Sequence, residues 1–204
     1  MKKIFVSLVL IFAVGSLFAE NNSTIVLDAA HGGKDTGTQS KITINTKKVK
    51  LYEKDITLAI CKRVQALLND KEASLNLVLT RNSDTFISLK KRNAVLDKNA
   101  ICISIHCETS TDKNKRGFNV LIAENASENT KKLVGELSGN LEREIADKMP
   151  NLGVLTYENA QNNIIVNIGY LSNENDALLL MDDNFIDACA NAILKAIEEY
   201  SKAK

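Results

Sequence analysis

The sequence predicts a single α/β domain, in which a mostly parallel or mixed twisted sheet is flanked by helices. Short apolar runs typical of buried strands alternate along the chain with longer segments whose apolar residues recur at helical spacing. The 204-residue chain has one proline, Pro150, and neither a Gly/Ser-rich linker nor an internal repeat. About 185 residues follow the N-terminal segment, which is enough for one domain with a substantial core.

Residues 1–19 are predicted to be a secretory signal peptide. Lys2 and Lys3 precede a run from Ile4 to Val14 that is apolar except for Ser7, and Gly15, Ser16 and then Ala19 follow before Glu20. This order is typical of a signal peptide, and the run is too short for a stable membrane span. We therefore expect export to the periplasm or cell envelope and a folded domain over 24–204, with a retained N-terminal anchor as the alternative.

The folded part begins with a strand, a hairpin and a helix. Residues 24–27 are a short apolar run that ends at Asp28, and Ala-Ala-His-Gly-Gly follows as a turn. Residues 41–51 alternate around Asn45-Thr-Lys-Lys, which predicts a hairpin. Apolar residues at helical spacing then predict a helix over 53–68.

The middle of the chain holds three more predicted strands. They cover residues 75–79, 101–105 and 119–123, and the second of these ends on His106. Between the first two, Ser88 is expected to cap a helix. That helix carries Leu89, Val95 and Leu96.

Predicted helices and strands also alternate in the last third of the chain. Apolar residues at helical spacing predict a helix over 133–145, and residues 164–166 are predicted to form a buried strand. Asn173 is expected to cap a helix over 177–181, and a final helix covers 185–197. In such α/β sheets the site usually lies at the carboxyl ends of the strands.

Charge and cysteine content narrow the possible functions. The formal net charge is only +1, which does not indicate a nucleic-acid-binding protein. Cys61 and Cys189 fall on apolar faces of predicted helices, and Cys102 lies among isoleucines. We interpret such cysteines as small buried hydrophobic residues rather than as disulfide partners.

The two histidines of the chain, His31 and His106, each lie at or just beyond the end of a predicted strand. Imidazole is a frequent zinc ligand, and a third ligand can be a carboxylate. Glu53, at the start of the first long helix, is a candidate for it. On the residues alone the assignment stays open, because 25 acidic residues compete for the position.

An ordered series of motifs runs along the chain after the signal peptide. The series comprises Ile25-Val-Leu-Asp-Ala-Ala-His-Gly-Gly-Lys-Asp-Thr-Gly37, Glu53-Lys-Asp-Ile-Thr-Leu-Ala59, Thr80-Arg-Asn-Ser-Asp84, Leu89 to Arg92, Ser104-Ile-His106, Lys115-Arg-Gly-Phe118 and Gly169-Tyr-Leu-Ser-Asn173. In this order the motifs resemble those of the zinc-dependent N-acetylmuramoyl-L-alanine amidases of the amidase-3 family. The match covers nearly the whole chain after the signal peptide, and an ordered series is more specific than one motif.

The resemblance implies that His31, Glu53 and His106 bind one Zn²⁺ ion. It also implies that the substrate is peptidoglycan, cleaved at the amide between N-acetylmuramic acid and the L-alanine of the stem peptide. Arg81 and Arg92 are candidates for contacting acidic groups of the stem peptide, with a structural ion-pair role as the equal alternative.

The chain departs from the family at the catalytic position. The family usually carries a glutamate where this chain has Asn167, and an amide cannot take up a proton near neutral pH. Glu108, two positions after His106, is a possible substitute base, and Glu158 and Glu174 are further candidates. The alternative is a catalytically impaired protein that binds zinc and peptidoglycan; a slow enzyme with Asn167 in place is a third reading.

Three further differences concern the surroundings of the predicted zinc site. Cys107 follows a ligand, but neighbours on a strand point to opposite faces, so its side chain is expected to face away from the metal. The stretch between His31 and Glu53 is longer than the resemblance leads us to expect, and its alternation predicts an added hairpin over one rim of the site. The segment from Gly117 to Pro150 has no room for an inhibitory helix, so no activator is expected to be required.

Overall fold

The computed structural model describes residues 24–71, 75–94, 100–157 and 163–202. Its strands are β1 (Ile25–Ala29), β2 (Gln39–Ile44), β3 (Lys47–Tyr52), β4 (Leu77–Leu79), β5 (Ile101–Glu108), β6 (Phe118–Ala123), β7 (Asn151–Tyr157) and β8 (Asn163–Tyr170). Its helices are α1 (Glu53–Asp70), α2 (Leu89–Ala94), α3 (Glu128–Ile145), α4 (Glu174–Leu179) and α5 (Asp183–Lys202). The predicted signal peptide lies outside the described residues.

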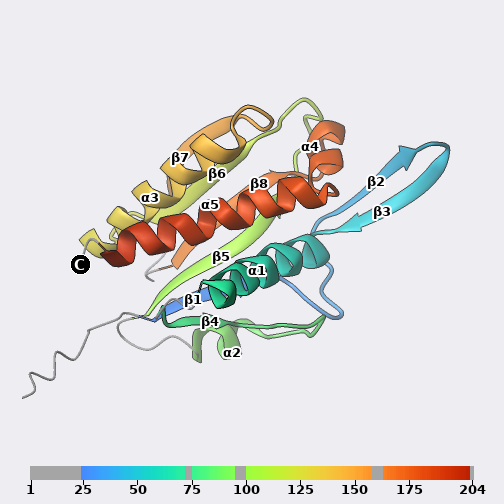
Figure 1. Cartoon of the computed structure of the whole chain (residues 1–204). Helices are drawn as coiled ribbons and strands as arrows, with labels where there is room; N and C mark the ends of the chain where they lie inside the picture. The colour runs from blue at the N-terminus through green and yellow to red at the C-terminus, as the bar shows by residue number, and fades with distance from the viewer. Residues whose placement is uncertain (1–23, 72–74, 95–99, 158–162, 203–204) are drawn as a thin grey trace, which may run out of the picture.

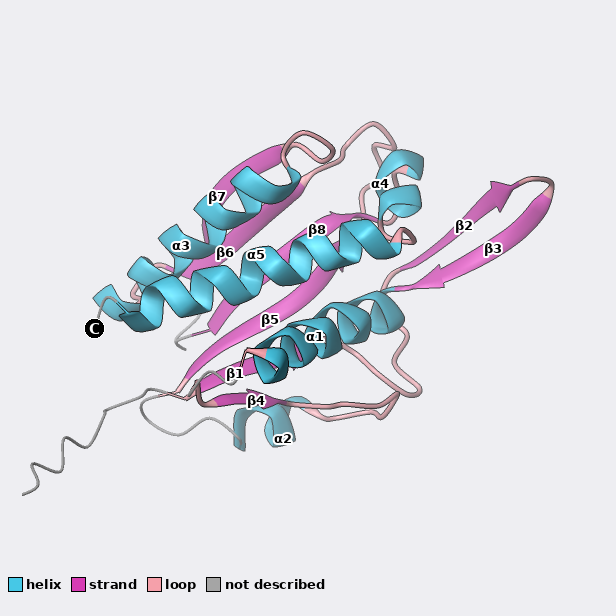
Figure 2. Ribbon diagram, viewed as in Figure 1, coloured by secondary structure: helices cyan, strands magenta, loops and turns pink. Residues whose placement is uncertain are grey.

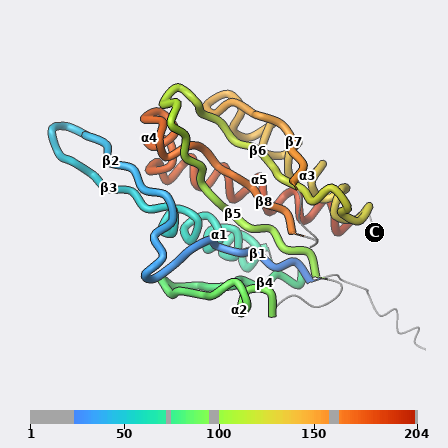
Figure 3. The backbone as a smooth tube through the Cα atoms, turned by 180° about the vertical axis from the view of Figure 1, so that it is seen from behind, coloured from blue at the N-terminus to red at the C-terminus, as the bar shows by residue number. Residues whose placement is uncertain are grey.

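Six strands form one mixed sheet in the order β4-β1-β5-β8-β6-β7, which confirms the predicted fold class. All neighbouring strands are parallel except β6 and β8, which run antiparallel. Helices α1, α5 and α3 lie side by side over one face of the sheet, as Figure 1 and the reverse view in Figure 3 show. The long helices therefore leave the other face of the central strands available for a site.

The core lies between the sheet and the three long helices. Alternate residues of β5, namely Ile103, Ile105 and Cys107, are buried in it, together with the apolar residues of α1, α3 and α5. The intervening residues Ser104 and His106 line a groove on the opposite face. This period of two sends one half of β5 to the core and the other half to the site.

Strands β2 and β3 form a separate two-stranded hairpin that projects from the body of the molecule (Figure 2). The turn between them has positive φ at Asn45 (47°) and Thr46 (69°). A two-residue turn with positive φ at both positions matches the right-handed twist of the two strands that it joins. The hairpin predicted over 41–51 is confirmed.

Strand β7 and helix α2 differ most clearly from the prediction. Strand β7 was not expected, because it lies at the sheet edge, where Leu152, Val154 and Leu155 are exposed and burial gives no regular pattern. The residue Leu89 of α2 is 78% exposed, since this short helix packs through the buried Arg92 instead. Val95 and Leu96, expected in the same helix, lie outside the described residues.

The four cysteines, Cys61, Cys102, Cys107 and Cys189, are buried and free, which confirms that they act as small apolar residues. Burial also raises the pKa of the Cys61 and Cys107 thiols well above the usual range. Within the described residues, none of the helices has both the length and the apolar character that crossing a membrane requires.

Candidate metal centre

His31, Glu53 and His106 come together at one site. Each offers a ligand atom, and these atoms all lie within 4.8 Å of one another. His31 lies just beyond the end of β1, Glu53 is the first residue of α1, and His106 lies in β5 next to β1. The strand continues two residues past His106, to Glu108, so the prediction that β5 ends on this histidine was wrong.

Glu53 is the centre of the cluster. Its Oε2 atom lies 3.1 Å from Nε2 of His31, and its Oε1 atom lies 3.1 Å from Nδ1 of His106. The backbone N–H groups of Thr38 and Cys107 donate to the same carboxylate at 2.8 and 3.0 Å. Burial acts to raise the pKa of Glu53, but these hydrogen bonds outweigh it and hold the pKa well below its usual range.

A second carboxylate orients His31. Its Nδ1 atom lies 2.9 Å from Oδ2 of Asp35, which leaves Nε2 directed at Glu53. The hydrogen bond to Glu53 is the largest influence on the pKa of His31 and, with the contact to Asp35, raises it against the effect of burial. A carboxylate on the outer nitrogen is the usual arrangement around a metal-binding histidine, because it fixes the tautomer and the ring orientation.

The backbone adopts the left-handed conformation at His31 and at Gly37, which both lie at this site. His31 has φ of 61°, which is uncommon for a residue with a side chain, and Arg92 donates to its carbonyl oxygen at 2.5 Å. Gly37 has φ of 60°, and a Cβ atom there would lie 2.5 Å from Oε2 of Glu53 and 2.6 Å from Cδ2 of His31. Only glycine leaves room for the two candidate ligands to meet.

The donor set suits a divalent metal. A buried, ionised carboxylate lies between two imidazoles, so one negative charge and two imidazole nitrogens surround one point. Two histidines and one glutamate are also a known catalytic zinc set that leaves a position for water or substrate. The part-exposed rings of His31 (25%) and His106 (31%) show that this position is reachable from solvent.

Asn167 and Glu108 lie beside the candidate ligands. Asn167 is opposite His106 in the register of β8 against β5, and its side chain is buried. Its Nδ2 atom donates to Oε1 of Glu108 at 2.8 Å and to Oδ1 of Asn119 at 2.9 Å. Asn119, on β6, has no counterpart among the predicted site residues, and only its pairing with Asn167 across the sheet identifies it.

A cavity of about 380 Å³ joins these residues to the metal centre. His31, Glu53, His106, Glu108 and Asn167 all line it. Of the other candidate bases, Glu158 lies outside the described residues, and Glu174 begins α4 and lines neither cavity described here. Glu108 is therefore the candidate base that the fold brings to the site.

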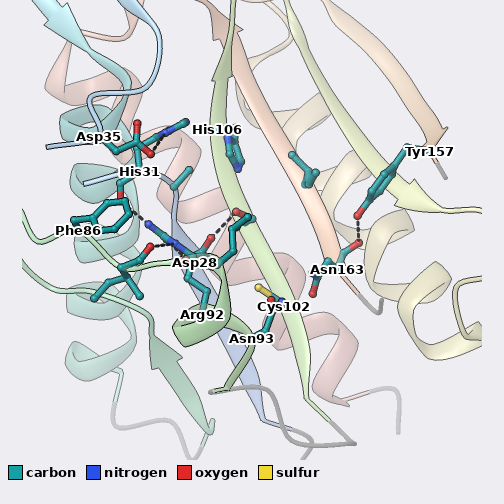
Figure 4. Close-up of a pocket in the computed structure, with 15 residues that line it drawn as sticks. Asp28, His31, Asp35, Phe86, Arg92, Asn93, Cys102, His106, Tyr157 and Asn163 are labelled. Atoms are coloured by element: carbon teal, nitrogen blue, oxygen red, sulfur yellow. Dashed lines mark hydrogen bonds and ion pairs between the residues drawn. The ribbon is translucent and has the colours of Figure 1, made fainter. Parts of the chain in front are cut away.

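A larger cavity of about 540 Å³ runs from the metal centre over the face of the sheet that the long helices leave uncovered. His31 and His106 lie toward one end of it and Cys102 toward the other, with Asn163 and Tyr157 along one side (Figure 4). The two cavities share His31, His106 and Ile165. An elongated ligand can therefore lie across the candidate metal centre.

Arg81 and Arg92 are engaged within the protein. Arg81 is 4% exposed and donates to the carbonyl oxygens of Ala29, Ala30, Ser83 and Lys54. Arg92 forms a buried ion pair with Asp28 and holds the backbone of Ala29 and His31. This geometry favours the structural alternative for both residues, in which they shape the loop that carries His31.

Cys107 is 5% exposed and belongs to the hydrophobic core. Within the described part of the chain, the residues that could hold a metal include His31, Glu53 and His106 but no cysteine. Cys107 instead contributes its backbone N–H to Glu53.

Comparison with known proteins gives consistent relatives. A family model described as N-acetylmuramoyl-L-alanine amidase matches residues 25–199. The probable N-acetylmuramoyl-L-alanine amidase AmiB of Haemophilus influenzae is 39% identical over 52% of this chain and 23% of its own length. The probable cell wall amidase LytH of Staphylococcus saprophyticus is 31% identical over 88% of this chain and 58% of its own length. The chain thus spans less than two thirds of each of these two relatives.

A solved structure has the same architecture. The catalytic domain of CwlV, an N-acetylmuramoyl-L-alanine amidase from Bacillus (Paenibacillus) polymyxa var. colistinus, superposes with a TM-score of 0.72 at 28% identity. The match covers 89% of this chain and 99% of that domain.

Proposed function

The chain belongs to the N-acetylmuramoyl-L-alanine amidase family, and from this premise we propose that it is a Zn²⁺-dependent amidase of the cell wall. Its substrate would be peptidoglycan, and the bond cleaved would join N-acetylmuramic acid to the L-alanine of the stem peptide. The observation that carries the proposal is the convergence of His31, Glu53 and His106, with Glu53 ionised and buried between the two imidazoles.

His31, Glu53 and His106 would hold the ion. Zinc in such a site polarises an amide carbonyl and lowers the pKa of water toward about 7. Asp35 keeps Nε2 of His31 turned toward Glu53. The backbone N–H groups of Thr38 and Cys107 keep the Glu53 carboxylate in place. The chain itself therefore preorganises the ligand set.

Glu108 is the residue we assign to proton transfer. Asn167 occupies the position of the family's glutamate and cannot accept a proton near neutral pH, but its Nδ2 atom holds Oε1 of Glu108. In this arrangement the Glu108 carboxylate takes a proton from the attacking water and returns it to the leaving amide nitrogen. Asn167 acts as a positioning residue, and Asn119 fixes the Asn167 amide in turn.

The surroundings fit a polymeric substrate in the cell envelope. The 540 Å³ groove crosses the open face of the sheet and leads to the metal centre, so a glycan-peptide can lie along it. Between Gly117 and Pro150, strand β6 and helix α3 leave no further helix among the described residues. We accordingly propose that the protein works after export and needs no activator to open its site.

The second candidate function is binding of zinc and peptidoglycan without turnover. Asn167 is the observation that favours it, since loss of a positioned general base typically lowers the rate about 10²–10⁴-fold. The two functions share the metal centre and the groove and differ only in whether Glu108 replaces the missing carboxylate.

The test is release of stem peptides from purified sacculi. The zinc-loaded protein should release them, whereas the chelated protein and the His31→Ala variant should not, and metal analysis of that variant should show lost zinc. No release by the loaded protein, with zinc and sacculi still bound, would support the binder. Zinc retained by His31→Ala would refute the ligand assignment.

A further inference from the structure

The β2–β3 hairpin carries a strip of positive charge on one face. The register pairs Lys41 with Lys50 and Thr43 with Lys48 across the two strands. Side chains of directly opposed residues point to the same face, so Lys41, Lys48 and Lys50 share it. All three lysines are exposed, and among the described residues no ion pair within 4.0 Å reaches any of them.

The other face of the hairpin is the one that packs against the protein. Ile42 is 6% exposed and belongs to the core, and Ile44, Val49 and Leu51 pack against that core as partly buried residues. Strand β2 also contacts helix α4. Because the apolar face is the buried one, the lysine face is the face that is exposed to solvent.

The arrangement of these lysines is unfavourable in the protein alone. Like charges directly opposite in an antiparallel pair destabilise it, and Lys41 lies opposite Lys50. The segment from residue 39 to residue 52 contains no aspartate or glutamate, although the whole chain has a net charge of only +1. A ligand with several negative charges would turn this repulsion into attraction.

The hairpin also continues directly from the metal centre. Strand β3 ends at Tyr52, and the next residue is the candidate ligand Glu53. Just before β2, Gly37 and Thr38 line the cavity at the metal centre. Each six-residue strand extends about 20 Å, so a polymer bound at the metal can reach the lysine face.

We propose that the lysine face of the hairpin, formed by Lys41, Lys48 and Lys50, binds carboxylate groups of peptidoglycan stem peptides. This inference rests on the proposed function, since it takes the same polymer as the ligand of both surfaces. Stem peptides carry acidic groups at intervals along the glycan, and a strip of lysines next to the metal centre complements them. The hairpin thereby adds affinity for the polymer that a soluble fragment does not receive.

The experiment measures cosedimentation of the zinc-loaded protein with purified sacculi at low and high salt. The variant Lys41→Gln/Lys48→Gln/Lys50→Gln should bind about tenfold more weakly at low salt and lose most of its salt dependence, since each exposed ion pair contributes about 0.2–1 kcal/mol. The matched control Lys62→Gln/Lys132→Gln/Lys202→Gln changes the net charge equally on α1, α3 and α5 and should bind like the wild type. Unfolding temperatures of the two variants verify that both fold.

Two further arms identify the ligand. Sacculi whose carboxyl groups have been amidated should bind the wild type as weakly as the hairpin variant binds untreated sacculi. Equal binding by the two triple variants would overturn the proposal. A loss that appears on anionic phospholipid vesicles but not on sacculi would also overturn it, in favour of a membrane surface. Because sedimentation requires no turnover, failure of stem-peptide release leaves this result unaffected.

Discussion

The side-chain amide of Asn167 donates a hydrogen bond of 2.8 Å to the carboxylate of Glu108, two positions along β5 from the candidate ligand His106. Asn167, which the resemblance places at the position of the family's glutamate, therefore contacts the residue that we propose as the substitute base. His106 and Glu108 face the same side of the sheet because they are two apart on one strand, and both line the cavity at the metal centre.

This relationship predicts the effect of removing the Glu108 carboxylate. Glu108→Gln should lower kcat for stem-peptide release by about 10²–10⁴-fold, because glutamine keeps the shape and the hydrogen bond but cannot accept a proton. Zinc content should stay at the wild-type level. The matched change Glu174→Gln removes a carboxylate on α4 away from the cavity and should leave kcat unchanged.

A second carboxylate at the family's position should restore the reaction. Asn167→Glu in the Glu108→Gln background is expected to recover release, measured by quantifying soluble muropeptides over time. Wild-type release by Glu108→Gln alone would show that Glu108 is not the base. Absence of release from the wild type, with recovery by Asn167→Glu, would identify the natural protein as the binder.

Arg92 is expected to matter for stability more than for substrate affinity. Its guanidinium pairs with the buried Asp28 and holds the carbonyl oxygens of Ala29 and His31. Arg92→Met leaves Asp28 without its partner, and breaking a buried pair from one side costs about 3–5 kcal/mol of the free energy of unfolding. Denaturant titration measures this loss. If stability is unchanged and KM for muropeptides rises, Arg92 contacts substrate instead.

Most of the fold and the candidate metal ligands could be predicted from the sequence, but two features could not. The long helices and buried strands follow apolar periodicity, so their existence was predictable, and the ordered motifs identified His31, Glu53 and His106 as partners. Edge strand β7 was missed because exposure of Leu152, Val154 and Leu155 removes the burial pattern. The contact of Asn119 with Asn167 depends on β6 lying antiparallel to β8, a pairing that local patterns do not encode.

The stability of the metal-free protein should fall as pH rises above about 6.5. The pKa of His31 is raised above its ordinary value of 6.5, chiefly by the hydrogen bond to Glu53. A raised pKa stabilises the fold fully below the unfolded value, and this contribution is lost as pH rises through the folded pKa. The lowered pKa of Glu53 acts at the acidic end, where its contribution is lost as pH falls below 4.5.

Zinc should reverse the slope above pH 6.5. A histidine must be deprotonated to bind a metal, so zinc binding displaces the proton from His31 and zinc affinity rises with pH over the same window. Unfolding temperatures between about pH 5.5 and 8.5, with excess zinc or excess chelator, should therefore diverge as pH increases. Parallel curves would show that His31 is not a ligand. His31→Gln serves as the control, in which the divergence should be lost.

Gly37 gives a final, local test of how the ligands are placed. Gly37→Ala should lower zinc affinity, because the added Cβ would lie 2.5 Å from Oε2 of Glu53 and a residue with a side chain is strained at φ of 60°. The strain adds about 1–2 kcal/mol of destabilisation. Gly135→Ala is the matched control: it lies in α3 with nothing within 4 Å of the new Cβ and should stabilise the protein by about 0.5–1 kcal/mol. Zinc titration and denaturant unfolding of the two variants separate these effects. Unchanged zinc affinity in Gly37→Ala would mean that the close approach of Gly37 to Glu53 and His31 is not needed to form the site.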